Sequence, residues 1–153
     1  MMMIGVGYSK TGKGTITSAM LQSCGDVVGV FNAENLKHRV NGGDEAQNLR
    51  WALLLKDKQV IISNEIDSKV SLNDNMIKTL CTRRDWMTAR VHCGNENSFL
   101  PNFFIVILAN DRPQITPFDD AVDNRVHAVN FGEISVDEPS NVMELKSVPN
   151  IKK

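Results

Sequence analysis

The feature that most constrains how this chain of 153 residues can fold is a glycine-rich loop close to its amino end. The loop, residues 7–13, follows an apolar stretch at 1–6 and leads into a helical pattern at 12–23. Its letters GYSKTGK fit the pattern GxxxxGK. A strand before this pattern and a helix after it form the setting in which backbone N–H groups and the positive end of a helix surround a phosphate. The sequence therefore predicts a nucleotide phosphate site built from Gly7, Tyr8, Ser9, Lys10, Thr11, Gly12, Lys13, Gly14 and Thr15.

Within this loop, Lys13 is a predicted catalytic residue, because its ammonium group would reach the β- and γ-phosphates. The Ser or Thr that usually follows such a lysine and binds Mg²⁺ is replaced by Gly14, and Thr15 stands one position later. Thr15 is therefore the candidate magnesium ligand of the loop. An ordinary glycine-rich turn between a strand and a helix is the alternative interpretation, and the position of the lysine argues against it.

Short apolar runs alternate with helical patterns along the chain. The runs are rich in β-branched or aromatic residues and are closed by Gly, Asn or Asp, which is typical of buried strands. Strands that alternate with helices predict an α/β fold with a mostly parallel central sheet flanked by helices. The expected strands are 1–6, 27–31, 60–62, 103–108 and 126–131, and the expected helices are 12–23, 44–55 and 72–82, the last capped by Ser71.

Two segments depart from this alternation. Residues 87–92 and 98–100 flank a polar stretch at 94–97, and together they predict a β-hairpin inserted before the fourth expected strand. Near the carboxyl end the sequence turns polar and contains prolines. Residues 1–131 are therefore expected to form the folded core, and 132–153 a loosely packed polar tail.

Two of the apolar runs end in polar residues of the kind that a nucleotide-hydrolysing site needs. Asn64 and Glu65 follow the third expected strand, where Glu65 is the candidate catalytic base and both are candidate ligands of the magnesium shell. Asn110 follows the fourth expected strand and is the candidate sensor of the γ-phosphate. Taken alone, each of these polar ends is equally typical of a strand cap or a turn.

Charge and cysteine content exclude several classes of protein. The 17 basic and 18 acidic residues give no overall electrostatic reason to bind nucleic acid, so any such binding must come from a local patch. Three cysteines without CxxC spacing argue against a zinc site or a disulfide framework, and favour a reducing compartment. Because no apolar run is long enough to cross a bilayer, a soluble intracellular protein with no membrane partner is expected.

In their order, these motifs resemble the ATPase core of superfamily 3 helicases, which are AAA+-like P-loop NTPases, and specifically the poxvirus-type primase-helicase branch of large DNA viruses. The resemblance spans residues 3–131. The phosphate loop, the acidic strand and the sensor strand match three of its motifs. A fourth segment resembles the branch's pattern of Lys, Thr-Gly-Gly-Asp, Ala-Arg and Phe-x-Pro-x-Phe, although the Thr-Gly-Gly-Asp run is here Thr-Arg-Arg-Asp. The matching residues are Lys78, Thr82, Asp85, Ala89, Arg90, Phe99, Pro101 and Phe103, followed by Asp120, Ala121 and Arg125 before the last strand.

The resemblance implies the ATP- and Mg²⁺-dependent motor core of a viral replication helicase. Such a core works as a hexameric ring, with ATP between subunits and an arginine of the neighbour at the γ-phosphate. Arg125 is the positional candidate for this arginine, and a surface arginine paired with Asp120 or Asp123 is the alternative. The hairpin would bind single-stranded DNA, and a separate primase or oligomerisation domain would be a further partner. The site of action would be the host cytoplasm or a replication factory. The candidate nucleic-acid-binding residues, which could also form a merely solvated face, are Lys78, Arg83, Arg84, Arg90 and His92.

Two other functions remain open at the level of sequence. A nucleotide kinase-like P-loop phosphotransferase is suggested by the run from Gly12 to Thr15, but the sequence offers no arginine-rich lid. A catalytically weak ATP-binding assembly subunit is favoured by Asn64, which carries no charge where a carboxylate is common, and by the short chain.

Overall fold

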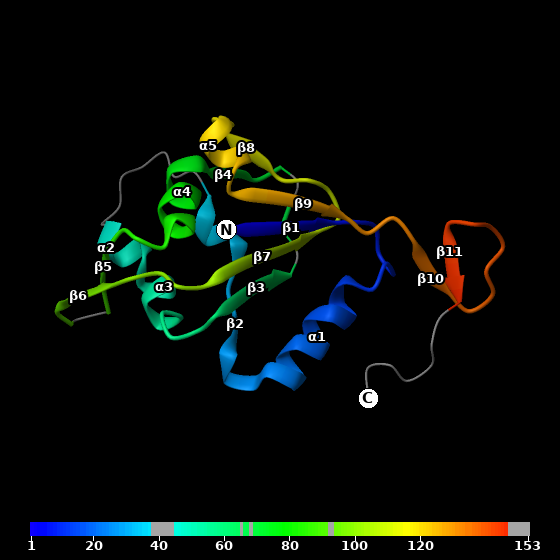
Figure 1. Ribbon diagram of the computed structural model, residues 1–153, viewed down its shortest axis with the longest axis horizontal. Helices are drawn as coiled ribbons and strands as arrows, with labels where there is room; N and C mark the ends of the chain where they lie inside the picture. Colours follow the sequence, from blue (N-terminus) through cyan, green and yellow to red (C-terminus); the bar gives the residue numbers. More distant parts are fainter. Residues whose placement is uncertain (38–44, 65, 68, 92–93, 147–153) are drawn as a thin grey trace.

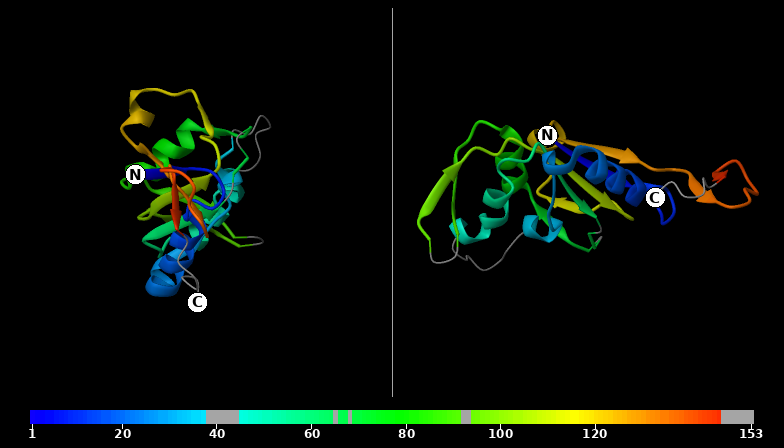
Figure 2. Two further views of the ribbon diagram at one scale, coloured as in Figure 1. Left: turned by 90° about the vertical axis from the view of Figure 1, so that its right-hand side faces the viewer. Right: turned by 90° about the horizontal axis from the view of Figure 1, so that it is seen from below.

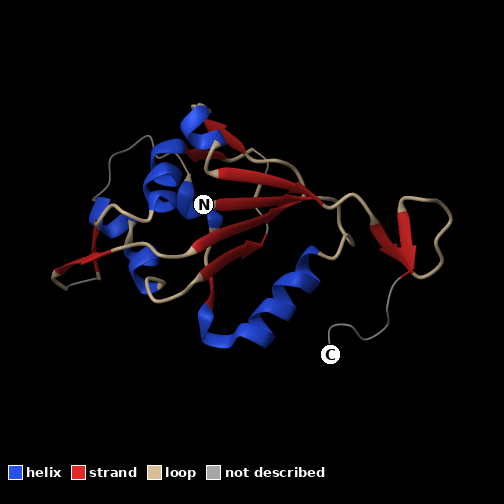
Figure 3. Ribbon diagram, viewed as in Figure 1, coloured by secondary structure: helices blue, strands red, loops and turns tan. Residues whose placement is uncertain are grey.

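The computed structural model describes residues 1–37, 45–64, 66–67, 69–91 and 94–146 (Figure 1). Within these residues the five expected strands form one sheet, all parallel, in the order β2-β3-β7-β1-β9. Helices flank the sheet (Figure 3), so the predicted α/β fold with a mostly parallel sheet is confirmed. The strands are β1 (Met2–Val6), β2 (Val28–Val30), β3 (Val60–Asn64), β7 (Phe104–Ala109) and β9 (Val126–Asn130).

The two faces of the sheet are covered by different elements (Figure 2). Helix α1 (Lys13–Cys24) packs on one face, where Met20 and Leu21 lie against a small cluster that includes Leu108. The other face carries the larger core, in which Ile4 of β1 belongs to the same cluster as Ile77 of the fourth helix. The middle strands are thus buried on both sides, as their nearly continuous apolar runs require.

The helix predicted at 44–55 is interrupted in the structure. It is divided at Leu49 into α2 (Glu45–Asn48) and α3 (Arg50–Leu54), and residue 44 lies outside the described residues. Leu49 is buried, so the break occurs where the chain turns its apolar side chains into the core. Single-turn helices also occur at η1 (Gly25–Val27), η2 (Ala33–Leu36) and α5 (Asp120–Asp123).

The helix predicted at 72–82 begins later than expected. Its first residues form the strand β4 (Ser71–Asn73), which pairs in parallel with β8 (Gln114–Thr116), and the helix is α4 (Asp74–Thr82). Asn73, rather than Ser71, caps this helix, since the Asn73 side-chain oxygen accepts the N–H of Met76 at 2.9 Å. The strand pairing of residues 71–73 is the reason that the helix cannot start earlier.

The expected hairpin is present as β5 (Met87–Arg90) and β6 (Glu96–Phe99), which pair antiparallel. Met87 and Phe99, which face each other across the pair, are buried, so the hairpin packs onto the body by one face. Its polar stretch was expected to be a turn at 94–97, but Glu96 and Asn97 belong to the second strand. The turn therefore falls before residue 96.

The polar tail contains regular structure. Strands β10 (Ile134–Val136) and β11 (Glu144–Lys146) pair in parallel and extend beyond the end of the main sheet (Figure 1). The N–H of Ser135 donates to the carbonyl of Lys10 at 2.9 Å, so this segment is attached to the phosphate loop. The division into a folded core of residues 1–131 and a loosely packed polar tail stays a prediction, and the structure adds two short paired strands within the tail.

Close packing around Phe131 explains two glycines of the first strand and loop. The backbone N–H of Phe131 donates to the carbonyl of Val6 at 2.7 Å, which holds the end of β9 beside the end of β1. A Cβ atom on Gly7 would lie 2.6 Å from the carbonyl oxygen of Phe131, and one on Gly5 would lie 2.7 Å from its ring. Only a residue without a side chain allows the strands to approach this closely.

We predict opposite effects for two glycine substitutions in this region. Gly7→Ala should lower the free energy of unfolding by about 1–3 kcal/mol, because a backbone atom cannot move aside as a side chain can. Gly14→Ala should raise it by about 0.5 kcal/mol, because alanine restricts the unfolded chain and favours the helix. No atom lies within 4 Å of a Cβ at Gly14. Urea denaturation of both variants measures this difference, and equal stabilities would contradict the packing around Phe131.

Candidate nucleotide site and nucleic-acid surface

The phosphate loop leaves the carboxyl end of β1 and enters α1 through two left-handed residues. Lys10 has φ of 67° and Gly12 has φ of 84°, so the backbone curls back on itself between them. The carbonyl of Gly12 then accepts the first helical bonds, from the N–H groups of Thr15 at 3.0 Å and Ile16 at 3.1 Å. The first turn of α1 contains no acidic residue, so no carboxylate of its own neutralises the positive end of the helix dipole. This geometry is suited to an anion.

Lys13 lies inside the curl of the loop. Its ammonium group donates to the carbonyl of Gly7, to the carbonyl of Tyr8 at 2.7 Å and to the hydroxyl of Thr11 at 3.3 Å. The Thr11 hydroxyl in turn donates to the Tyr8 carbonyl at 2.9 Å. Carbonyl and hydroxyl oxygens are weaker partners for an ammonium group than phosphate oxygens, so a bound phosphate would compete well for Lys13.

The sheet register brings the other strand-end residues to the same edge. The N–H of Gly7 donates to the carbonyl of Ala109 at 3.2 Å, and Asn110 follows directly and is exposed. The backbone of Asn64 pairs with Leu108 on the other side of β7. Asn110 therefore lies between the phosphate loop and the end of β3, as its predicted role requires.

The predicted magnesium ligands are only partly described. Thr15 is half-buried in the first turn of α1, close to Lys13 in the chain. Asn64 ends β3, but its side chain lies outside the described residues, and so does the whole of Glu65. In the described part of the chain, no group of three His, Cys, Asp or Glu side chains could hold a metal ion. Binding of Mg²⁺ by Thr15, Asn64 and Glu65 stays a prediction.

Arg125 immediately precedes β9, whose start lies at the opposite end of the sheet from the phosphate loop (Figure 1). Its carbonyl accepts the N–H of Met2 at 2.8 Å, so it is beside the beginning of β1, whereas the loop follows the end of that strand. The separation is about 16 Å, since a strand rises about 3.3 Å per residue over the five residues from Met2 to Gly7. Within the described residues its guanidinium forms no ion pair with Asp120 or Asp123 and instead donates to the carbonyl of Ala121 at 2.7 Å.

The predicted nucleic-acid-binding residues that the structure describes lie on α4, directly after it and on β5. Arg83 ends α4 in a left-handed conformation, with φ of 56°, and both it and Arg84 are exposed. Arg90 lies on β5 opposite Glu96, and His92 lies outside the described residues. The exposed arginines therefore lie where α4 leads into the hairpin.

The charge of Lys78 is already paired. Its ammonium group lies 2.8 Å from a carboxylate oxygen of Asp74 and 2.6 Å from one of Asp119. The hydrogen bond to Asp119 is the main cause that raises the pKa of Lys78, and the same bond lowers the pKa of Asp119. Binding of Lys78 to DNA stays a prediction, and any DNA phosphate would have to compete with these two carboxylates.

Trp86 is a surface residue that the sequence analysis did not select. Its side chain is 72% exposed, which is unusual for tryptophan, and it immediately precedes β5. Met87 and Ala89 point into the core, so the alternation of a strand turns Trp86, Thr88 and Arg90 to the outer face. That alternation is visible in the sequence and could have indicated the exposed ring.

Within the described residues, no helix has the length and apolar character that crossing a bilayer requires. The exposed apolar side chains are instead spread over several elements.

The chain matches one protein family and is similar in sequence to a virophage protein. Residues 6–125 match a family described as "Family of unknown function (DUF5906)". A protein of Sputnik virophage named "Putative helicase V13" is 41% identical over 134 residues, which cover 86% of this chain and 17% of that protein. The chain thus spans only about a sixth of this relative's length.

Solved structures share the fold at low sequence identity. Two structures of the apo C-terminal region of NrS-1 are each 16% identical and have TM-scores of 0.58 and 0.59. They cover 84% and 87% of this chain, which spans 28% of theirs. The family match runs from the end of β1 to the start of β9 and includes the phosphate loop, both polar strand ends and the hairpin, and the chain accordingly belongs to the DUF5906 family.

Proposed function

We propose that this chain is the ATP-binding and ATP-hydrolysing motor core of a DNA helicase of the superfamily 3, poxvirus-type primase-helicase branch, acting in viral DNA replication. The observation that carries the proposal is the meeting of the Lys13 loop, Asn110 and the end of β3 at one edge of a parallel sheet. The name of the Sputnik virophage relative, which contains the word helicase, agrees with it. The host cytoplasm or a replication factory would be the site of action.

On this proposal, the loop and the start of α1 bind the phosphates of ATP. Lys13 would exchange the carbonyls of Gly7 and Tyr8 for β- and γ-phosphate oxygens. Thr15, Asn64 and Glu65 are the residues that would hold a Mg²⁺ ion, which would supply positive charge to stabilise the phosphates. Glu65 would take a proton from the attacking water, and the Asn110 amide would hydrogen-bond the γ-phosphate.

Arg125 would act on the ATP of a neighbouring copy. Arg125 is too far from the phosphate loop of its own chain to contact the nucleotide bound there. At a neighbouring copy, its guanidinium would suit the negative charge that spreads over the transferring phosphoryl group. A ring of copies, a hexamer by resemblance to superfamily 3 helicases, would bring each Arg125 to the next nucleotide. A separate primase or oligomerisation domain could be part of the same assembly.

The outer face of the hairpin and its base would bind single-stranded DNA. An exposed indole provides a surface on which a base can stack, and the guanidinium groups of Arg83 and Arg84 would neutralise phosphates nearby. Arg90 and His92 extend this surface by their positions in the sequence. The binding would be independent of base sequence, because stacking and phosphate contacts do not read base edges.

A catalytically weak ATP-binding assembly subunit is the second candidate. Asn64 favours it, because an amide at the end of β3 provides no negative charge for a metal shell. ATP binding without turnover, in the presence of single-stranded DNA, would support this candidate over the motor. Phosphate transfer to a nucleoside monophosphate would instead support a nucleotide kinase.

We predict that Lys13→Ala lowers ATP affinity by a factor of about a hundred or more, since it removes a cation that would contact two phosphates. Lys58→Ala is the matched control, because Lys58 pairs with Asp26 at the far β2 edge of the sheet. Isothermal titration calorimetry gives both affinities. If Lys13→Ala binds ATP with unchanged affinity, the loop is not the nucleotide site.

We also predict that Arg125→Ala binds ATP normally but hydrolyses it about a thousandfold more slowly, because the charge that the arginine meets develops in the transition state. Glu65→Gln should be inactive for a different reason, the loss of the base. Mixing the two proteins should restore turnover, since an intact Glu65 of one chain can meet an intact Arg125 of another. Parental turnover by Arg125→Ala in demonstrated oligomers would contradict the role.

Trp86 should report DNA binding by its fluorescence. The chain has two tryptophans, and Trp51 is stacked on Phe31 with ring centroids 5.2 Å apart. Oligo(dT) should therefore quench the Trp51→Phe protein, in which only Trp86 emits, and leave the emission of Trp86→Phe unchanged. Trp86→Ala should weaken binding by about 1–3 kcal/mol, whereas Arg84→Ala should also reduce its salt dependence. If oligo(dT) quenches the Trp86→Phe protein and leaves the Trp51→Phe protein unchanged, the hairpin surface around Trp86 is not the DNA-binding site.

A further inference from the structure

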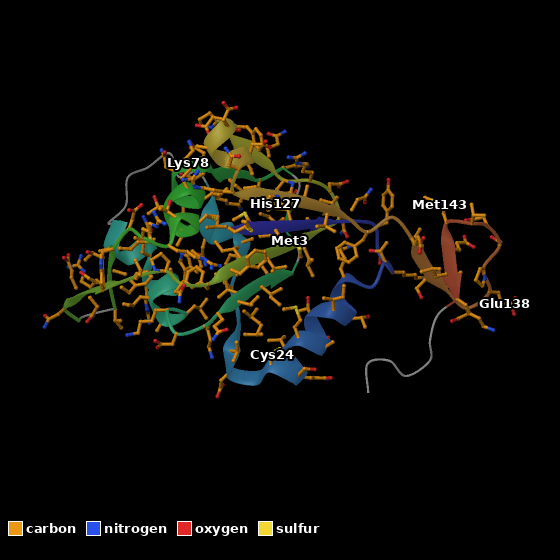
Figure 4. All side chains as sticks on the ribbon, viewed as in Figure 1. Met3, Cys24, Lys78, His127, Glu138 and Met143 are labelled. Atoms are coloured by element: carbon orange, nitrogen blue, oxygen red, sulfur yellow. The ribbon has the colours of Figure 1, made fainter. Side chains whose placement is uncertain are left out.

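Lys78 lies between two helices that are far apart in the sequence (Figure 4). It belongs to α4, and its ammonium group contacts Asp74 one turn earlier at 2.8 Å and Asp119 at 2.6 Å. Asp74 is 4% exposed and the Lys78 side chain is 23% exposed. The Asp119 side chain is 49% exposed, so the partly dry pair is the one with Asp74, and it holds the Lys78 ammonium group beside Asp119.

Asp119 joins this pair to α5. One of its carboxylate oxygens contacts Lys78, and the other accepts the N–H of Val122 at 2.9 Å as the N-cap of the helix. A helix of four residues cannot hold itself together and depends on its cap and on the buried Val122. The position of Asp119 therefore decides the position of α5.

Helix α5 in turn holds Arg125. The guanidinium of Arg125 donates a hydrogen bond of 2.7 Å to the carbonyl of Ala121, which lies in the first turn of α5. The other end of the connection is α4, which ends at Thr82 and leads through two exposed arginines to the hairpin. Two contacts, one at Asp119 and one at Ala121, thus connect the helix beside the hairpin to Arg125.

We propose that Lys78 is a positioning residue, whose ion pair with Asp119 fixes α5 and so aims Arg125 at the nucleotide of a neighbouring copy. The inference rests on the proposed function, because it assigns Arg125 to that nucleotide. It also makes α4 the link through which the DNA-binding hairpin and the arginine move together. Lys78 is then a structural member of the motor and does not contact DNA.

The pair itself can be tested without any oligomer. Asp119→Asn keeps an oxygen that caps α5 but removes the charge that Lys78 meets, and Lys78→Met keeps the length of the side chain without the ammonium group. In both variants, amide hydrogen exchange in α5, at Val122 and Asp123, should become about fivefold faster or more, while exchange in β1 stays unchanged. Lys58→Met is the control. Unchanged exchange in α5 in both variants would overturn the proposal.

Turnover distinguishes positioning from DNA contact. In both variants kcat should fall about ten- to a hundredfold with KM for ATP unchanged, because a small displacement of a catalytic group is enough. The double variant should be no worse than Lys78→Met alone, because Lys78→Met already breaks the contact that Asp119→Asn weakens, together with the contact to Asp74. If Lys78→Met keeps its basal kcat and loses only affinity for oligo(dT), Lys78 is a DNA contact and the proposal is wrong.

Mixing Lys78→Met chains with Lys13→Ala chains shows whether Lys78→Met damages the phosphate loop or the placement of Arg125 in the shared ATP site. Lys78→Met chains would keep an intact phosphate loop, and Lys13→Ala chains would keep a correctly placed Arg125. The mixture should therefore regain turnover, whereas a Lys78→Met chain that is merely misfolded would not be rescued. If Arg125→Ala alone is fully active, the role proposed for Arg125 fails, and the positioning role of Lys78 fails with it. If Arg125→Ala is inactive but Asp119→Asn and Lys78→Met are fully active, only the positioning role fails.

Discussion

The parallel register of β1 with its two neighbours is the constraint on which the rest of the structure depends. Met2 pairs with Ile105 and Val126, and Val6 pairs with Ala109 and Asn130. Because all strands of the sheet run the same way, whatever follows a strand is brought to one edge and whatever precedes a strand is brought to the other. A slip of one residue would exchange the side chains that pack on the two covered faces and move Asn110 away from the loop.

This direction divides the functional candidates into two groups at opposite ends of one small body. The loop of Lys13, the amide of Asn110 and the end of β3 lie at the carboxyl edge, while Arg125, α5 and the approach to the hairpin lie at the amino edge. A single copy therefore contains both halves of the proposed ATP-hydrolysing site but cannot join them. On the proposed function, association of copies completes the chemistry, and the contacts around Lys78 connect the amino-edge half to the hairpin.

The phosphate loop is also stable in itself. Its lysine is satisfied by loop oxygens, its curl is made by two left-handed residues, and its base is held to β9 by the backbone of Phe131. Buried or half-buried polar groups need hydrogen-bond partners, and oxygens of the loop itself provide them for Lys13. A phosphate would be a stronger acceptor for the same ammonium group. The attachment of Ser135 to Lys10 shows that the segment after the sheet takes part in this arrangement.

The sequence by itself determined the strands, the loop and their order, because apolar runs, glycine spacing and strand-to-helix alternation are local signals. It also identified Lys13, Asn110 and Arg125, whose positions agree with the roles expected of them, although the roles themselves stay predictions. Tertiary structure alone decided three matters. Residues 71–73 form a strand because they pair with β8. Lys78 forms an ion pair with Asp119, which is 41 residues away in the sequence. The N–H of Ser135, in the polar segment after the sheet, donates to the phosphate loop. Each depends on a partner distant in the chain, and local patterns carry no information about such partners.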